Sequence, residues 1–264
     1  MTKALSTTKA KAPRNRKNLD DAGKRNASQT ARAALLLREM VIDGHFCPGE
    51  RIKEIPLAAK LRVSRIPLRL VLERLAHEGL LEIRPTRGFV VQQFSTTDIY
   101  DAIDLRGLLE GAAARLASER LRDPRDLNPL REANGAMEAL FGARKLTLEA
   151  FTTYIEMNAR FHAALAELSH SRILCRAIRQ ASSLPFGSPS AFLLKQHFLA
   201  GSRHLFLVAL DHHRGIIDAI ESREGTRAET LAREHARLAR RNLDSALEDR
   251  ELLKWVRGGK LIGL

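Results

Sequence analysis

The chain has 264 residues, of which 44% are apolar and 5% aromatic, and it carries a formal net charge of +13. This length suits roughly two domains with packed cores. No apolar stretch approaches the roughly 20 residues that span a bilayer, so we expect no membrane-spanning segment. Cys47 and Cys175 lie far apart and form no metal or redox motif, which favours a reduced, cytoplasmic compartment.

The positive charge is concentrated in the first third of the chain. Residues 1–93 hold 19 Lys and Arg against 9 Asp and Glu, whereas the remainder holds 25 against 22. This asymmetry indicates a polyanionic partner, either nucleic acid or an anionic membrane, although a solvated basic surface has the same composition. Residues 1–27 are polar and basic, lack the apolar segment of a secretory signal, and are predicted to form a disordered tail.

Residues 28–94 have the pattern of three helices followed by a hairpin. Apolar residues recur at helical spacing from Thr30 to Gly44, and a second, short helix fits Ile55 to Leu61. A third helix begins after Ser64, whose hydroxyl we expect to cap it. Two short apolar runs then flank a turn that contains Gly88. This order predicts a winged helix-turn-helix domain, with three helices and a two-stranded wing.

The rest of the chain is predicted to be helical. Ser95 or Thr96 is expected to cap the first of these helices. The apolar stripe predicted for that helix consists of Leu105, Leu108, Leu109, Ala112 and Leu116. Further helical stripes follow, with a clear break over Ser182 to Ser190. The protein is therefore predicted to be mainly α, with an all-α antiparallel bundle over residues 97–249 and a C-terminal tail over residues 250–264.

The third helix has the pattern of a DNA-reading element. Arg65 and Arg69 are four residues apart and share one face, while the leucines lie on the opposite face. In a helix-turn-helix, the N-terminal residues of the second helix contact base edges, and arginine pairs with guanine there. Ser64 can reach a phosphate, and Arg87 with Gly88 at the hairpin tip can meet the minor groove or a phosphate. The alternative is a packing module whose arginines form surface salt bridges.

The stretch PGERI, followed by LAAKLRVSRIPLRLVLERLAHEGLLEIRPTRGFVV, resembles the N-terminal domain of the GntR family of bacterial transcriptional regulators, over about residues 30–93. The resemblance implies contacts with operator DNA by Ser64, Arg65, Arg69, Arg87 and Gly88. The sequence differs from the usual family pattern at Ile66, where a small residue is more common, and at Leu70 and Val71, where Glu and Ala are usual. Ile55 stands where fatty-acid-responsive members carry an arginine. These differences bear on the operator sequence rather than on the fold.

The segments NARFHAAL, HHRGIIDAI and REHARLARR, together with residues 98–120, resemble the C-terminal FCD domain of the FadR subfamily. By themselves, nine histidines on helices are more often surface or core residues than ligands. The resemblance implies instead that Asn158, His162, His213 and His235 bind a divalent metal, with Zn²⁺ or Ni²⁺ favoured. Because the neutral amide of Asn158 replaces the usual aspartate, we expect the metal to be held more weakly.

Arg106 lies where the family often directs an arginine toward the effector cavity. Its guanidinium could bind a carboxylate through two hydrogen bonds, and the alternative is a salt bridge with Glu110, four residues later. These patterns predict a dimeric, ligand-responsive transcription factor that binds palindromic operator DNA, with a small carboxylate as effector and no membrane as partner. Repression is the starting hypothesis, although the sequence leaves the direction of regulation open.

Two other classes of function remain as alternatives. Three histidines and a water also form a catalytic zinc site, so a metal-dependent hydrolase with a basic accessory domain is one of them. The absence of a His-Glu-x-x-His motif, a phosphate loop and a nucleophile elbow argues against an enzyme. A helical scaffold whose histidines bind nothing is the other alternative.

Overall fold

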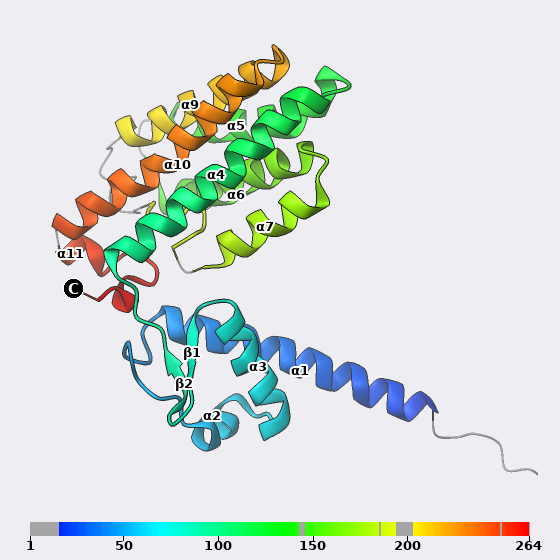
Figure 1. Cartoon of the computed structure of the whole chain (residues 1–264), viewed down its shortest axis with the longest axis vertical. Coiled ribbons are helices and arrows are strands. Elements are labelled where there is room, and N and C mark those ends of the chain that lie inside the picture. The colour runs from blue at the N-terminus through cyan, green and yellow to red at the C-terminus, as the bar shows by residue number, and fades with distance from the viewer. Residues whose placement is uncertain (1–15, 143–145, 185, 194–202, 249, 264) are drawn as a thin grey trace, which may run out of the picture.

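The computed structural model describes residues 16–142, 146–184, 186–193, 203–248 and 250–263. It is mainly helical, with a winged helix-turn-helix at the N-terminus and a helical bundle after it, which confirms the predicted fold class (Figure 1). Within the described part of the chain, we find no helix whose length and apolarity would let it cross a membrane.

The N-terminal domain, called the head below, contains three helices and a hairpin. Its elements are α1 (Arg16–Ile42), α2 (Glu54–Leu61), α3 (Arg65–His77), β1 (Leu81–Arg84) and β2 (Gly88–Val91). The two strands pair in an antiparallel register that joins Leu81 to Val91 and Arg84 to Gly88. The hairpin is the predicted wing.

The first helix begins at Arg16, well before Thr30, where the apolar pattern starts. Helix therefore covers the second half of the segment that we expected to be a disordered tail, and residues 1–15 of that segment lie outside the described residues. Residues such as Ala22 and Ala27 favour a helix without forming an apolar stripe, which is why the apolar pattern does not reveal this part of α1.

Buried leucines hold α3 in the head. Leu68, Leu72 and Leu75 are each at most 1% exposed, and they belong to an apolar cluster that includes Leu37 of α1. Arg62 makes the turn between α2 and α3 in a left-handed conformation, with φ of 54°. The apolar face of α3 thus packs inward, which leaves the face with its arginines in solvent.

Ser64 occupies the N-cap position of α3, with φ of −76° and ψ of 169°, but its hydroxyl makes no capping hydrogen bond. The prediction that this hydroxyl caps the helix is therefore wrong. A capping side chain accepts from the N–H of the second or third helical residue. The third residue of α3 is Pro67, which has no N–H to donate.

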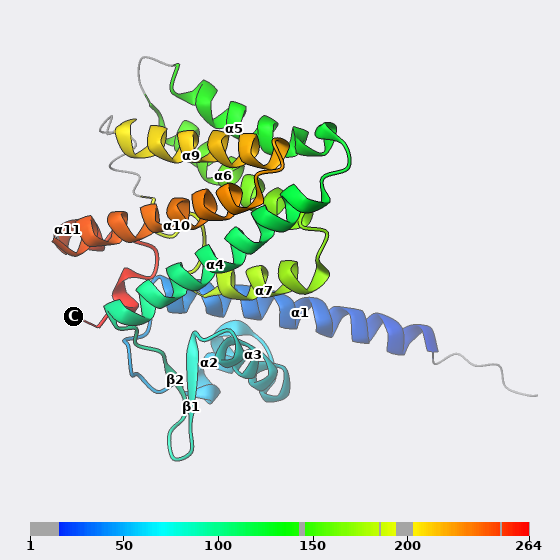
Figure 2. The same cartoon turned by 45° about the horizontal axis from the view of Figure 1, so that its top comes forward.

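The C-terminal domain, called the bundle below, is built from α-helices and short 3₁₀ helices, without a strand in its described residues. Figures 1 and 2 show it as a separate layer beside the head. Its elements are α4 (Thr96–Arg120), η1 (Pro124–Leu127), α5 (Asn128–Leu140), α6 (Leu148–Leu168), α7 (Arg172–Ser183), α9 (Arg203–Glu221), α10 (Gly225–Glu248), α11 (Arg250–Leu253) and η2 (Gly259–Leu261).

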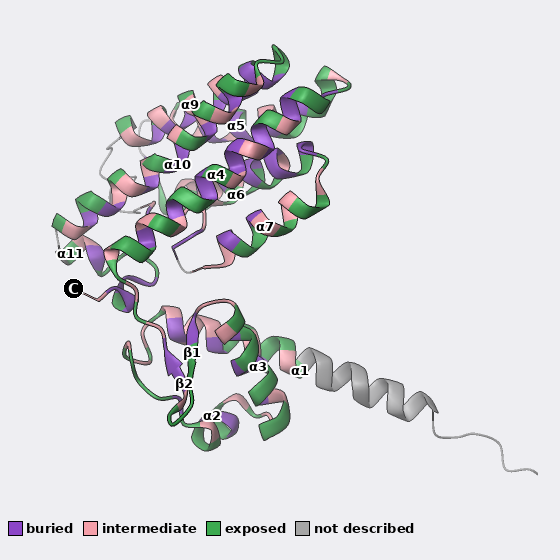
Figure 3. Cartoon of the chain, viewed as in Figure 1, coloured by how far each residue is buried: buried purple, intermediate pink, exposed green. Residues whose placement is uncertain are grey.

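Figure 3 shows buried residues along α4 interleaved with intermediate and exposed ones. The predicted apolar stripe is not the buried face, because Leu105 is 46% and Leu108 is 48% exposed, while Leu109, Ala112 and Leu116 are half-buried. The buried face carries Gly107 and Gly111 instead. A Cβ at Gly107 would lie 2.9 Å from the Cβ of Ala236, so α10 can pass this closely only over small residues.

The C-terminal segment returns to the junction between head and bundle (Figure 1). The N–H of Phe94 donates to the carbonyl of Leu261 at 2.9 Å, and the N–H of Gly263 donates to the carbonyl of Phe94 at 2.9 Å. Leu253 and Leu261 are buried in the same apolar cluster as the leucines of α3. The segment that the sequence suggested was a tail therefore contributes to the core shared by the two domains.

The cap of α4 offers a test of these local assignments. Ser95 accepts from the N–H of Asp98 at 3.1 Å, and the N–H of Ser95 donates back to Oδ2 of Asp98 at 2.7 Å, which forms a capping box. Ser95→Ala should lower the free energy of unfolding by about 1 kcal/mol, measured by chemical denaturation of the full chain. Ser64→Ala is the matched control and should change it by less than about 0.5 kcal/mol. Equal losses in the two variants would contradict the assignment.

Candidate functional site

One concave surface of the head brings together most of the residues predicted to contact DNA. This surface, called the basic surface below, has a volume of about 700 Å³. It is formed by the N-terminus of α3, the start of α2 and the wing. Its lining includes Arg65, Arg69, Arg87 and Gly88. Ser64 lies outside it and lines an adjoining hollow.

The arginines of the basic surface are available for a ligand. Arg65 is exposed, and Arg69 is 68% exposed with its Nε 3.7 Å from Oε1 of Glu73. An exposed pair at this distance contributes little, so a phosphate or a base can displace it. Gly88 has φ of 68°, a left-handed conformation that favours glycine at the wing.

Two further cations line the basic surface and were missed by the sequence analysis. Arg51 and Lys53 are exposed on either side of Ile52, which is 3% exposed. Arg51 forms an isolated antiparallel bridge with Val90, and the N–H of Ile52 donates to the carbonyl of Phe89 at 2.8 Å. The alternation of charged and apolar residues here is the signal of an extended segment, and it could have placed both cations on one side of the wing.

The bundle contains a second site, in which three buried histidines from three helices meet. His162 comes from α6, His213 from α9 and His235 from α10, and their ligating atoms all lie within 4.8 Å of one another. Nε2 of His235 is 3.2 Å from Nε2 of His213 and 3.3 Å from Nε2 of His162. We call these residues the histidine cluster.

Two of these rings have a polar neighbour at Nδ1, and one of these neighbours sets a tautomer. Nδ1 of His213 lies 3.2 Å from Oδ1 of Asn134, and Nδ1 of His162 lies 3.1 Å from Oε1 of Glu110. The Asn134 oxygen can only accept a hydrogen bond, so Nδ1 is the protonated nitrogen of the neutral His213 ring, which keeps a lone pair on Nε2. That lone pair faces Nε2 of His235, which in turn faces Nε2 of His162. The cluster is therefore better matched to a cation than to hydrogen bonds alone.

The protonation of the site follows from its burial. Burial lowers the pKa of His213 and of His235 well below the usual value, because a charged ring would lose its hydration. Burial would raise the pKa of Glu110, but the charges of His162 and Arg106 outweigh it and lower that pKa to about 2. Glu110 is therefore a buried carboxylate that is ionised at neutral pH.

Arg106 and Glu110 form the salt bridge that was the alternative interpretation of Arg106. Nη1 of Arg106 lies 2.9 Å from Oε2 of Glu110, and both side chains are 2% exposed. The Nε of Arg106 has no hydrogen-bond partner among the residues that the structure describes. Arg106 thus pairs with Glu110 and keeps its Nε–H as a free donor. Arg106 also lines a pocket. The sequence analysis considered Glu110 only as this partner and missed its contact with the histidine cluster, which no sequence spacing indicates.

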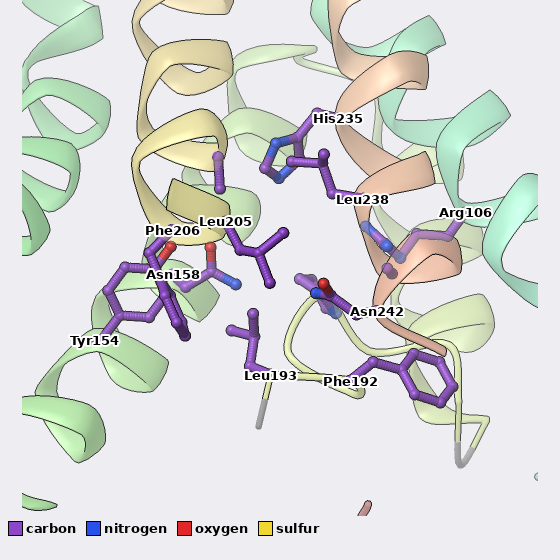
Figure 4. A pocket seen from close by; sticks show the side chains of 13 residues that line it. Arg106, Tyr154, Asn158, Phe192, Leu193, Leu205, Phe206, His235, Leu238 and Asn242 are labelled. Carbon is purple, nitrogen blue, oxygen red and sulfur yellow. The ribbon is translucent and has the colours of Figure 1, made fainter. Parts of the chain in front are cut away.

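This pocket, called the inner pocket below, lies beside the histidine cluster. Figure 4 shows Arg106, Asn158 and His235 around it, from α4, α6 and α10. Asn158 is 3% exposed and its Nδ2 donates to Oγ of Ser190 at 3.0 Å. The free volume is about 30 Å³, which is enough for a water or an ion but not for an organic acid. The apolar part of the lining includes Tyr154, Phe192, Leu193, Phe206 and Leu238.

Known proteins resemble both parts of the chain. Residues 29–91 match the bacterial regulatory proteins of the gntR family, and residues 101–238 match the FCD domain. The Nta operon transcriptional regulator of Aminobacter aminovorans is 34% identical over 148 residues. These cover 54% of this chain and 65% of that regulator, which is less than two thirds of its length.

Two further proteins match a larger share of the chain. An uncharacterized HTH-type transcriptional regulator in an unstable DNA locus of Streptomyces ambofaciens is 31% identical over 211 residues, 77% of this chain and 80% of that one. The solved structure of E. coli McbR/YncC shares the fold, with a TM-score of 0.57 and 22% identity over 84% of this chain and 98% of that one. With a winged head and a histidine-containing bundle in one molecule, the chain belongs to the gntR family of bacterial regulatory proteins and carries an FCD domain.

Proposed function

We propose that this protein is a cytoplasmic transcription factor that binds palindromic operator DNA as a homodimer and responds to a small carboxylate held near a divalent metal ion. The observation that carries the proposal is the presence of two separate sites in one chain. The head offers a basic concave surface with an exposed recognition helix, and the bundle offers a buried histidine cluster next to a pocket.

The basic surface supports DNA binding through three of its elements. The N-terminus of α3 would enter the major groove, where Arg65 and Arg69 can each pair with a guanine. Arg87 at the wing would reach the minor groove or a phosphate, and Gly88 lets the backbone approach closely. Ser64 and the uncapped first turn of α3 would meet a phosphate, because free N–H groups at a helix N-terminus attract anions.

The exposed stripe of α4 supports a homodimer. Leu105 and Leu108 are nearly half exposed on a helix whose other face is buried. Apolar side chains grouped on one helix face are typical of a subunit interface. Two copies joined through this face would present two heads, as a palindromic operator requires.

The histidine cluster fits a divalent metal such as Zn²⁺ or Ni²⁺. His162, His213 and His235 would supply three ring nitrogens, and the tautomer that Asn134 sets for His213 leaves a lone pair on its Nε2 for the purpose. When bound, the metal would act as a Lewis acid that attracts a carboxylate. Asn158 would add a neutral oxygen where the family usually has a carboxylate, so the affinity for the metal should be lower.

A small carboxylate is the effector that the inner pocket supports. The unpaired Nε–H of Arg106 is a buried donor. An oxygen of an incoming carboxylate could accept a hydrogen bond from it. The free volume of about 30 Å³ means that an acid can enter only if the apolar wall moves. That wall includes Phe192, whose ring stacks on Phe186 at 5.9 Å, and Phe186 meets Phe94 of the interdomain linker at 5.3 Å. Movement of this wall is our proposed route from effector to head.

The metal-dependent hydrolase gains no support. The similar proteins named above are regulators rather than enzymes. The carboxylate nearest the histidine cluster, Glu110, is held by Arg106 and His162, so it is not free to act as a general base toward a substrate.

Metal analysis of purified protein tests the histidine cluster. We expect about one divalent ion per chain in the wild-type protein and loss of that ion in His213→Ala, which removes a central ligand. His212→Ala is the control, because His212 neighbours the cluster in sequence but is not one of its members. Asn158→Asp should bind the metal about tenfold more tightly, since a carboxylate replaces a neutral oxygen. Retention of the ion by His213→Ala would contradict the proposed ligand set.

DNA binding by the full chain tests the basic surface. Replacing Arg65 and Arg69 together by alanine should weaken binding to the selected operator by at least about tenfold, because each arginine–guanine pair contributes about 1–3 kcal/mol. Fluorescence anisotropy at several salt concentrations measures the affinity, which should fall steeply with salt for the wild-type protein. The matched control replaces Arg172 and Arg176, an exposed pair with the same spacing on α7. Equal affinities for wild-type protein and the Arg65/Arg69 variant would refute the groove assignment.

A further inference from the structure

The exposed face of α3 combines arginines with large aliphatic side chains. The first, second, fifth and sixth residues of this helix are Arg65, Ile66, Arg69 and Leu70, and all four are exposed. Ile66 is 79% and Leu70 is 57% exposed. Because residues four apart share a helix face, α3 presents two parallel stripes, one cationic and one aliphatic.

The packing of the head does not account for the aliphatic stripe. The buried residues of α3 already form a complete inner face, and β-branched residues such as Ile66 have no advantage in helix propensity over smaller ones. Ile55 at the start of α2 is 66% exposed and lines the same hollow as Ile66. Exposed aliphatic side chains that cluster in this way mark a contact surface.

The surroundings of the stripe indicate what contacts it. Ile66 also lines the basic surface, together with Arg51, Lys53 and Arg87. This surface carries five cationic side chains against the single carboxylate of Glu54, which matches a polyanion such as DNA better than a protein partner. In the major groove of DNA, by contrast, thymine presents a C5-methyl group among the polar base edges, and apolar side chains contact it.

We infer that Ile66 and Leu70 read thymine methyl groups in the operator, beside the bases that Arg65 and Arg69 contact. Successive helical residues are about 100° apart around the helix axis, so the aliphatic stripe would meet base edges adjacent to those that the arginines meet. The inference rests on the proposed DNA-binding function and deepens it. It assigns a preference for thymine at defined positions of each half-site to two named side chains.

The size of the effect follows from burying one methyl group. Such a burial corresponds to about a fourfold change in affinity. Deoxyuridine differs from thymidine only by this methyl group, so replacing one dT by dU removes the proposed contact and keeps the base pair.

The experiment begins with the full-length protein and a pool of randomised duplexes, from which the preferred site is selected. Each thymine of that site is then replaced by deoxyuridine, one at a time, and the affinities are compared by anisotropy. The wild-type protein should lose about fourfold at one or more thymines in each half-site. Ile66→Ala and Leu70→Ala should each abolish the thymine–uracil difference at its own position.

Two controls separate this contact from other effects. Ile173→Ala removes an isoleucine that is 85% exposed on α7, outside the head, and should keep the wild-type thymine–uracil differences. Arg69→Ala should weaken binding but also keep those differences. Circular dichroism checks that the head variants remain folded, as expected for substitutions of exposed side chains.

Three results would overturn the inference, and they can be told apart. If deoxyuridine at every thymine leaves the wild-type affinity unchanged, the proposed methyl contact does not exist, whereas the proposed regulator function stands. Ile66→Ala and Leu70→Ala could both keep the wild-type thymine–uracil differences, which would assign the aliphatic stripe to another partner. A protein that prefers no selected site over random duplex would contradict the proposed function as well.

Discussion

Burial of the Glu110 carboxylate is the constraint on which the bundle depends. An ionised carboxylate inside a protein is destabilising by several kcal/mol unless charged and hydrogen-bonding partners surround it. Arg106 on the same helix and His162 on α6 are those partners. Because this network joins α4 to α6 and includes one ring of the histidine cluster, the contacts that compensate the buried charge also position part of the candidate metal site.

Close packing of two helices makes this arrangement possible. Gly107 and Gly111 let α10 approach α4, and α10 carries His235 into the histidine cluster. The small residues occupy the inner face of α4, and Leu105 and Leu108 lie outside, where a second subunit could cover them. The small residues on the inner face of α4 thus bear on both the proposed metal site and the proposed dimer.

Head and bundle share a continuous apolar cluster, which includes residues of α1, α3, α4 and the C-terminal segment. The backbone hydrogen bonds of Phe94 with Leu261 and Gly263 fix that segment against the linker. A change in the wall of the inner pocket would therefore reach the junction through packed rings rather than through a flexible tether. This is a physical basis for a response in the head to binding in the bundle.

The sequence by itself determined the features that depend on local order. Helical periodicity, turn glycines and the Ser95 cap defined the head and the bundle, and helical spacing placed Arg65 with Arg69. Which histidines meet came from the family resemblance. Only the tertiary structure decided which face of α4 is buried, that Glu110 contacts His162, and that the C-terminal segment joins the core. These outcomes depend on contacts between residues far apart in the chain, which periodicity and propensity do not encode.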